Sequence, residues 1–180
     1  DENMTACKSF LSCQKGYFSS TGASLCTKCP IGTYSDMDGG TSCIDVPAGF
    51  YGTGCDENMT ACKSRNPCPV GYFSSTAASF CTKCPIGRYS DSMGAPTCPF
   101  VPGGTYSSEC DNNMTACKST LPCPSGHYCR KSSRMPRECI SGKYAEDVGS
   151  VNCINCAPGR FASENGSIVC NPCIEGRYNP

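Results

Sequence analysis

The cysteines of this chain recur at fixed positions within a long sequence repeat. Residues 1–55 align with residues 56–110 without a gap and share 35 of 55 positions, including all six cysteines. A third copy starts in the same register at residue 111 and then diverges. The repeat predicts three cysteine-rich domains, residues 1–55, 56–110 and 111–180, the last of which contains the start of a further module.

A repeat this rich in cysteine indicates a disulfide scaffold. The chain has 20 cysteines in 180 residues and no tryptophan, and large aliphatic residues are scarce, so an apolar core for the whole length cannot be assembled. Disulfides replace such a core and persist in oxidising compartments. We therefore expect a small disulfide-rich fold of β-hairpins and irregular loops with little helix, an elongated array of stapled modules. We expect it to be secreted or on the cell surface.

Each repeat contains a shorter unit, C-x-x-G-x-[YF], followed by small polar residues and a second cysteine. One example is "CQKGYFSSTGASLC", which runs from Cys13 to Cys26. Its glycine supplies a positive φ for a turn, and its aromatic residue begins an extended stretch, so the unit predicts a small hairpin. Closing a loop of about 14 residues contributes roughly 3 kcal/mol in the chain-entropy model. We expect the aromatic ring to pack on the disulfide; the rings concerned include Tyr34, Tyr89, Tyr144 and Phe161.

Twenty cysteines permit very many pairings, so the sequence alone does not fix one. If each hairpin closes on itself, the pairs are Cys13–Cys26, Cys29–Cys43, Cys68–Cys81, Cys84–Cys98, Cys139–Cys153 and Cys156–Cys170. Val46 and Val101 stand where the next unit should open with a cysteine, so its closing cysteine needs another partner. The nearest candidates give Cys55–Cys62 and Cys110–Cys117, and Cys123–Cys129 closes the short "CPSGHYC".

Cys7 and Cys173 are unpaired within the segment in this scheme. Their partners should lie beyond its ends or on another molecule, and we interpret the chain as a segment of a longer, processed polypeptide. No apolar run approaches the roughly 20 residues that span a bilayer. A membrane anchor outside the segment stays compatible with this interpretation.

The nonapeptide "DENMTACKS" begins the first two copies and carries a glycosylation motif. Asn-x-Ser/Thr occurs at Asn3, Asn58, Asn113 and Asn165, and we expect these asparagines to carry N-glycans on the surface. The alternative is a motif that was duplicated passively. The acidic pairs Asp1/Glu2 and Asp56/Glu57 resemble half of a calcium site, but the third copy has Asn112 instead of glutamate, which favours a solvated turn.

We expect neither catalysis nor a cofactor. His127 is the single histidine, and no nucleophile motif accompanies it. The C-x-x-C pairs follow the hairpin period, which argues against zinc or redox sites, and no metal is expected. The chain has 15 basic and 15 acidic residues and no basic block, so nucleic acid is not expected as a partner. No small-molecule substrate is expected either. The locally basic "CRKSSRMPREC" at 129–139 is interpreted as a solvated loop; contact with an acidic partner or glycan is the alternative.

The stretches "CTKCPIGTYS", "CTKCPIGRYS" and "CINCAPGRFAS" resemble the ephrin-receptor-like cysteine-rich repeats of extracellular proteins. The individual hairpin is also similar to the first module of tumour-necrosis-factor-receptor domains, where such a loop closes on itself. That resemblance implies the pairs within each module. It implies an extracellular array of stapled modules, but no single activity, because such repeats occur in receptors, matrix proteins, protist surface proteins and flagellar hairs.

Two functions agree with these observations. The first is a structural component of an N-glycosylated extracellular rod or filament, at the cell surface, in a matrix or in a flagellar hair. Its partners would be neighbouring copies of itself or of the same longer chain. The second is the ectodomain of a cell-surface receptor or adhesion protein that binds a protein ligand through the divergent third copy. The interchangeable first two copies favour the structural role.

Overall fold

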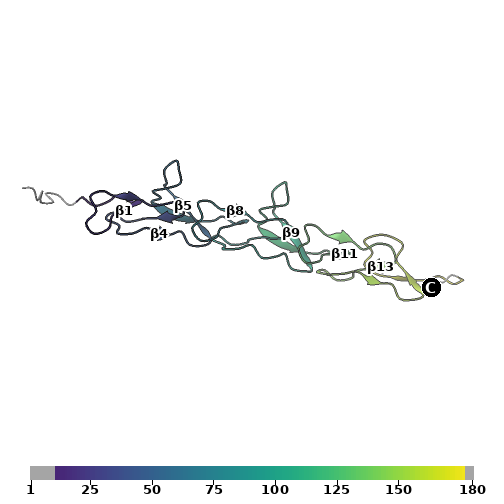
Figure 1. Ribbon diagram of the computed structural model, residues 1–180. Helices are drawn as coiled ribbons and strands as arrows, with labels where there is room; N and C mark the ends of the chain where they lie inside the picture. Colours follow the sequence, from purple (N-terminus) through teal and green to yellow (C-terminus); the bar gives the residue numbers. More distant parts are fainter. Residues whose placement is uncertain (1–10, 177–180) are drawn as a thin grey trace, which may run out of the picture. The chain divides into compact units, whose positions relative to one another are not determined.

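Short strand pairs make up the chain. The computed structural model describes residues 11–176. Sixteen strands form eight two-stranded sheets, and this part of the chain contains no helix (Figure 1). Residues 11–176 therefore include no helical segment that could cross a membrane.

The strands pair in chain order, each with its neighbour. The pairs are β1 (Tyr17–Phe18) with β2 (Thr27–Lys28), β3 (Thr33–Tyr34) with β4 (Ile44–Asp45), β5 (Phe50–Thr53) with β6 (Ser64–Pro67), β7 (Tyr72–Phe73) with β8 (Thr82–Lys83), β9 (Thr105–Ser108) with β10 (Ser119–Pro122), β11 (His127–Tyr128) with β12 (Arg137–Glu138), β13 (Lys143–Tyr144) with β14 (Ile154–Asn155), and β15 (Arg160–Phe161) with β16 (Asn171–Pro172). Every pairing between these strands is therefore local in sequence, as the hairpin unit predicts.

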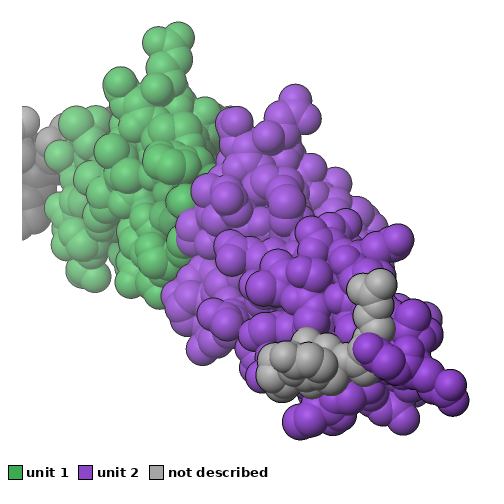
Figure 2. All heavy atoms as spheres, turned by 90° about the vertical axis from the view of Figure 1, so that its right-hand side faces the viewer, with its two compact units in different colours: residues 1–69, 73–82, 94–96 green, residues 70–72, 83–93, 97–180 purple. Residues whose placement is uncertain are grey.

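The described residues divide into two compact units (Figure 2). Unit 1 takes in residues 11–69, 73–82 and 94–96, and unit 2 takes in residues 70–72, 83–93 and 97–176. Each unit contains one copy of the "NMTACKS" element together with hairpin residues that precede it. The three domains given by the sequence repeat are defined by sequence alone, and their boundaries stay a prediction.

One backbone hydrogen bond recurs at the base of the hairpins. In the first, Tyr17 of β1 pairs with Lys28 of β2, and the N–H of Cys29 donates to the carbonyl oxygen of Gly16 at 2.9 Å. The same bond links Cys84 to Gly71, Cys139 to Gly126, Cys156 to Gly142, Val46 to Gly32 and Val101 to Gly87. The two valines therefore keep the backbone frame of a hairpin although they form no disulfide.

The structure contains nine disulfides, and they join the same pairs that the hairpin scheme gives. They are Cys13–Cys26, Cys29–Cys43, Cys55–Cys62, Cys68–Cys81, Cys84–Cys98, Cys110–Cys117, Cys123–Cys129, Cys139–Cys153 and Cys156–Cys170. Cys173 has no disulfide partner among the described residues. Cys7 lies outside them. The fold is thus a set of small stapled hairpin modules with irregular loops.

The core of unit 1 is one small cluster. Val46 is fully buried, and it packs with Tyr34 and Cys62, with Phe50 and Cys55 at the edge. In unit 2, Val101 and Cys117 are likewise fully buried. The valines therefore replace a disulfide with apolar packing, which stabilises without covalent closure.

The expected burial of the aromatic ring is wrong for Phe161. Tyr34 is 6% exposed, whereas Phe161 is 36% exposed, and Tyr89 and Tyr144 are half-buried. Tyr34 is covered because Val46 and Cys62 pack against it.

Candidate functional site

The element that sets each repeat apart from a plain hairpin is a short loop closed by its own disulfide. The first joint loop comprises residues 55–62, and the second joint loop comprises residues 110–117. Cys55–Cys62 closes the first and Cys110–Cys117 the second, each across a sequence separation of 7. The two loops lie in different units, so the same element occurs once in each unit of the described residues.

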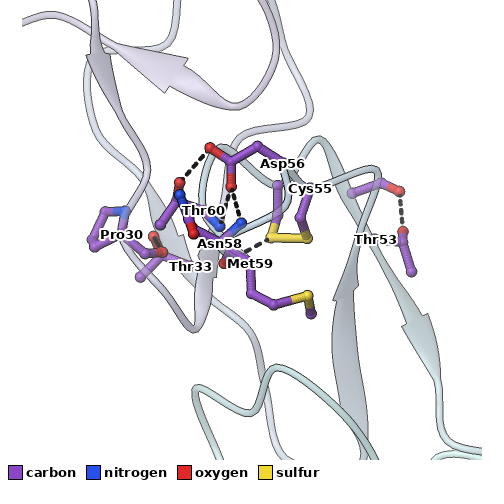
Figure 3. Close-up of a disulfide and its surroundings, with 10 residues drawn as sticks. Pro30, Thr33, Thr53, Cys55, Asp56, Asn58, Met59 and Thr60 are labelled. Atoms are coloured by element: carbon purple, nitrogen blue, oxygen red, sulfur yellow. Dashed lines mark hydrogen bonds between the residues drawn. A yellow bond between two sulfur atoms is a disulfide. The ribbon is translucent and has the colours of Figure 1, made fainter.

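Asp56 organises the first joint loop (Figure 3). Its Oδ1 accepts hydrogen bonds from the backbone N–H groups of Asn58 (3.2 Å) and Thr60 (2.8 Å), and its Oδ2 accepts one from the Thr60 hydroxyl (2.7 Å). The Asp56 N–H in turn donates to the Thr60 carbonyl oxygen at 2.9 Å. Aspartate forms such turns because its short side chain reaches backbone N–H groups two and more residues ahead.

A lysine from the first hairpin completes the carboxylate's partners. Lys28 Nζ lies 2.8 Å from Asp56 Oδ2, with about half of the lysine side chain exposed. The hydrogen bond from Lys28, followed by those from Thr60, lowers the pKa of Asp56 well below the usual range of an aspartate. Conversely, the hydrogen bond and the charge of Asp56 raise the pKa of Lys28.

The second joint loop repeats this geometry. Asp111 Oδ1 accepts from the N–H groups of Asn113 (3.1 Å) and Thr115 (2.8 Å), and its Oδ2 accepts from the Thr115 hydroxyl (2.7 Å). Lys83 Nζ lies 2.8 Å from Asp111 Oδ2. The pKa of Asp111 is lowered first by the hydrogen bond from Lys83 and then by those from Thr115, and the pKa of Lys83 is raised by Asp111.

The backbone fixes the loop to the hairpins before it. The Ala61 N–H donates to the Cys29 carbonyl oxygen (2.8 Å), and the Ser35 N–H donates to the Cys62 carbonyl oxygen (3.0 Å). Ala61 adopts φ 51°, and its carbonyl group lies against Gly16. A Cβ on Gly16 would collide with that carbonyl oxygen, and Gly16 itself has φ 85°. Glycine is therefore required there both for its backbone conformation and for space.

Unit 2 repeats this attachment as well. The Ala116 N–H donates to the Cys84 carbonyl oxygen (3.0 Å), and the Ser90 N–H donates to the Cys117 carbonyl oxygen (3.0 Å). A Cβ on Gly71 would meet the Ala116 carbonyl oxygen. In each unit the joint loop thus ties two consecutive hairpins together through backbone, side-chain and steric contacts.

The glycosylation motifs lie on accessible surface wherever the structure describes them. Asn58 and Asn113 are exposed on the two joint loops. Asn165 is exposed as well, and its Oδ1 accepts a hydrogen bond from the Ser141 N–H at 3.1 Å. Asn3 lies outside the described residues. Attachment of sugar at these positions stays a prediction.

The acidic pair at Asp56 and Glu57 does not form a cation site with other ligands. Asp56 is committed to Lys28 and Thr60, and Glu57 is exposed. No three His, Cys, Asp or Glu side chains within residues 11–176 gather closely enough to hold a metal ion. Asp1 and Glu2 lie outside the described residues.

His127 and the basic segment lie together in the third copy. The His127 Nδ1 is 3.0 Å from the Ser125 carbonyl oxygen, and its Nε2 is 4.0 Å from Glu138 Oε1. Neither contact is with a nucleophile. The basic segment borders a hollow of about 380 Å³, which the interpretation as a plain solvated loop does not anticipate.

Stapled hairpins of this kind, joined by short disulfide-closed loops, define an extracellular cysteine-rich module. Residues 16–62 match the family described as "Tyrosine-protein kinase ephrin type A/B receptor-like". This confirms the resemblance drawn from the C-x-x-G-x-[YF] units. The matched range runs from the turn of the first hairpin to the close of the first joint loop.

Several curated extracellular proteins are similar to this chain. "Signal peptide, CUB and EGF-like domain-containing protein 2" is 31% identical over 112 residues in Mus musculus and 30% over 152 residues in Danio rerio. These alignments cover 59% and 72% of this chain but 11% and 15% of the relatives. "Sushi, von Willebrand factor type A, EGF and pentraxin domain-containing protein 1" of Rattus norvegicus is 32% identical over 128 residues, 65% of this chain and 3% of the relative.

The chain therefore spans only a small part of the relatives it matches. What it shares with them is a cysteine-rich module of secreted or cell-surface proteins, and nine disulfides agree with that location. The chain is accordingly extracellular. The names of these relatives give CUB, EGF-like, sushi, von Willebrand factor type A and pentraxin domains.

Proposed function

We propose that the chain is a structural component of an N-glycosylated extracellular rod or filament, built from tandem stapled repeats. The observation that carries this proposal is the duplication of the joint loop. Asp56 with Lys28 in unit 1 and Asp111 with Lys83 in unit 2 make the same contacts at the same 2.8 Å distance. A site dedicated to one ligand needs one chemically distinct copy, whereas a spacer needs copies that are alike.

The joint loop has the properties of a connecting element. It ties two consecutive hairpins through local contacts, so each added repeat brings its own means of attachment. Proteins whose repeats contact only their neighbours extend in one dimension. The proposed partners are therefore neighbouring copies of the same repeat, in this chain or in the next.

Glycans at Asn58 and Asn113 fit this role. Both side chains are exposed on their joint loops, at the same position of successive repeats. A sugar on each loop would hydrate the surface at every repeat and shield exposed backbone edges from unwanted pairing. N-glycosylation at these positions is therefore proposed together with the filament.

Electron microscopy of the native material tests the structural role. Antibodies against the "DENMTACKS" peptide should decorate filaments at a regular axial interval in cell-surface or matrix preparations. Isolated, monodisperse particles that carry the epitope at one or a few positions would contradict the proposal.

The second candidate is a receptor or adhesion ectodomain that binds a protein through the third copy. The observation in its favour is the difference between the third copy and the other two, above all at residues 129–139. Capture of one defined extracellular protein by the chain, lost on replacing residues 130–138 with both flanking disulfides kept, would support this function. Filament decoration would favour the structural role.

A further inference from the structure

The basic loop, residues 129–139, carries a cluster of positive charges that the corresponding loops of the other two copies lack. Four of its side chains are exposed cations: Arg130, Lys131, Arg134 and Arg137. With Tyr128 and Met135 they line a hollow of about 380 Å³ that belongs entirely to unit 2. A cluster of like charges on a short loop repels itself, so the fold alone gains nothing from it.

The second copy shows what this loop looks like without the charges. In the register of the repeat, the four cations correspond to Ser75, Thr76, Ser79 and Thr82. All four positions in the second copy are small, neutral and polar, although both copies carry a glycine turn just before them. Four positions that are neutral in the second copy are thus basic in the third.

One backbone turn beneath these side chains recurs in both copies. Ser132 has φ 67° and donates its N–H to the Val101 carbonyl oxygen at 2.8 Å. Ala77, its counterpart, has φ 60° and donates to the Val46 carbonyl oxygen at 2.7 Å. The second copy forms this turn without the charges, although its hairpin is closed by Cys68–Cys81 and the third copy has Cys123–Cys129 instead.

No acid neutralises the cluster within the described residues. The ion pairs of residues 11–176 involve Lys28, Lys83 and His127, and none involves the four cations of the basic loop. Glu138, the adjacent acid, lies 4.0 Å from the His127 ring nitrogen. The cluster is available to an external anion.

Aromatic rings orient two of the cations. The Arg130 guanidinium lies 5.6 Å from the centre of the Tyr128 ring, and Lys131 Nζ lies 4.5 Å from the centre of the Phe100 ring. Stacking of this kind holds the charge in place while its N–H groups stay able to donate. A prearranged set of donors binds with less loss of side-chain entropy.

We propose that the basic loop binds a sulfated polysaccharide of the extracellular matrix. Arginine forks match the oxygens of a sulfate group, and several charges in sequence suit a linear polyanion better than a single ion. A protein partner needs a central apolar anchor, and Met135 is the one large aliphatic side chain that lines the hollow. The proposal goes beyond the structural role and does not depend on it.

Calorimetric titration of the secreted, disulfide-intact chain with a heparin-derived decasaccharide tests this site. We expect binding that weakens as salt is raised, and a loss of at least about tenfold in affinity for the variant R134S/R137T, whose new residues are those of the second copy. The matched control is K63S/K118S, which removes the same charge from exposed lysines beside the joint loops and should leave affinity unchanged. An equal loss in both variants would overturn the proposal.

The second copy provides a test that does not depend on loss of function. The variant S75R/T76K/S79R/T82R places the basic side chains on its loop and should raise the number of decasaccharides bound by one. The desulfated decasaccharide and a poly-glutamate peptide serve as competing probes. Binding of either as tightly as the sulfated sugar, or no binding by the unmodified chain, would refute sulfate recognition.

Discussion

The Nζ atom of Lys28 lies 2.8 Å from Oδ2 of Asp56, although the two residues belong to different 55-residue repeats of the sequence. Lys83 and Asp111 make the same pair in the second unit. The third copy has Glu138 where a lysine would follow and Gly166 where the aspartate would follow, so both partners are lost together. Because the lysine is lost where the aspartate is lost, the role of the lysine is to pair with the aspartate of the joint loop.

Replacing Asp56 with asparagine should loosen the first joint loop. The amide keeps one oxygen acceptor but loses the charge that attracts Lys28, and its NH2 group cannot accept the hydrogen bonds that Oδ2 accepts. We expect faster amide hydrogen exchange at Asn58 and Thr60 with the hairpins intact. Glu57→Gln, at an exposed neighbour, is the control and should leave these amides unaffected.

Acid should loosen both joint loops. Because folding lowers the pKa of Asp56 and of Asp111, their stabilising contribution is complete above the ordinary aspartate pKa of about 3.9 and is lost as pH falls through the lowered value. Protection of the Thr60 and Thr115 amides, measured relative to the exchange rate of an unfolded chain at the same pH, should thus persist at pH 4 and fall only at lower pH. Titration of either carboxyl group at its ordinary pKa would contradict the geometry.

Two glycines with the same backbone conformation should respond differently to alanine. Gly16 (φ 85°) faces the Ala61 carbonyl, whereas nothing lies within 4 Å of a Cβ on Gly22 (φ 79°). Gly22→Ala should cost only about 1–2 kcal/mol, the strain of the left-handed backbone alone, since the second copy already has Ala77 there at φ 60°. Gly16→Ala should cost clearly more, because the joint loop must move. Chemical denaturation with intact disulfides measures both.

Val46 should be the most sensitive apolar position of unit 1. It is fully buried against Tyr34 and Cys62, so Val46→Ala removes packing and leaves a cavity, at a cost of roughly 1–3 kcal/mol. Val148, which is 60% exposed, is the control, and Val148→Ala should change stability little. Equal effects of the two substitutions on thermal unfolding would show that the small cluster does not stabilise the unit.

The hairpins could be predicted from the sequence because their determinants are local. A glycine turn, an aromatic residue and two cysteines lie within about 15 residues. The repeat shows which cysteines keep the same spacing in successive copies. The extracellular location follows from the same cysteines. The contacts of the joint loop are less local, because Asp56 lies 28 residues after the Lys28 that it meets.

The remaining errors have the same cause. The ring of Phe161 is exposed because burial depends on what packs over a hairpin, which its own sequence does not specify. The hollow beside Arg134 arises from the fold of the loop and not from its charge. The recurrence of "CTKC" at one constant separation before each joint aspartate was a signal that could have revealed the ion pair.

The pairing of cysteines underlies the whole account, and peptide mapping without reduction tests it most directly. Proteolysis of the native protein should release the joint loop closed by Cys55–Cys62, and hairpin peptides linked by Cys13–Cys26 and Cys29–Cys43. Mass spectrometry identifies each linked pair from the mass change on reduction. A bond between Cys26 and Cys29, or between Cys55 and any cysteine other than Cys62, would contradict the account.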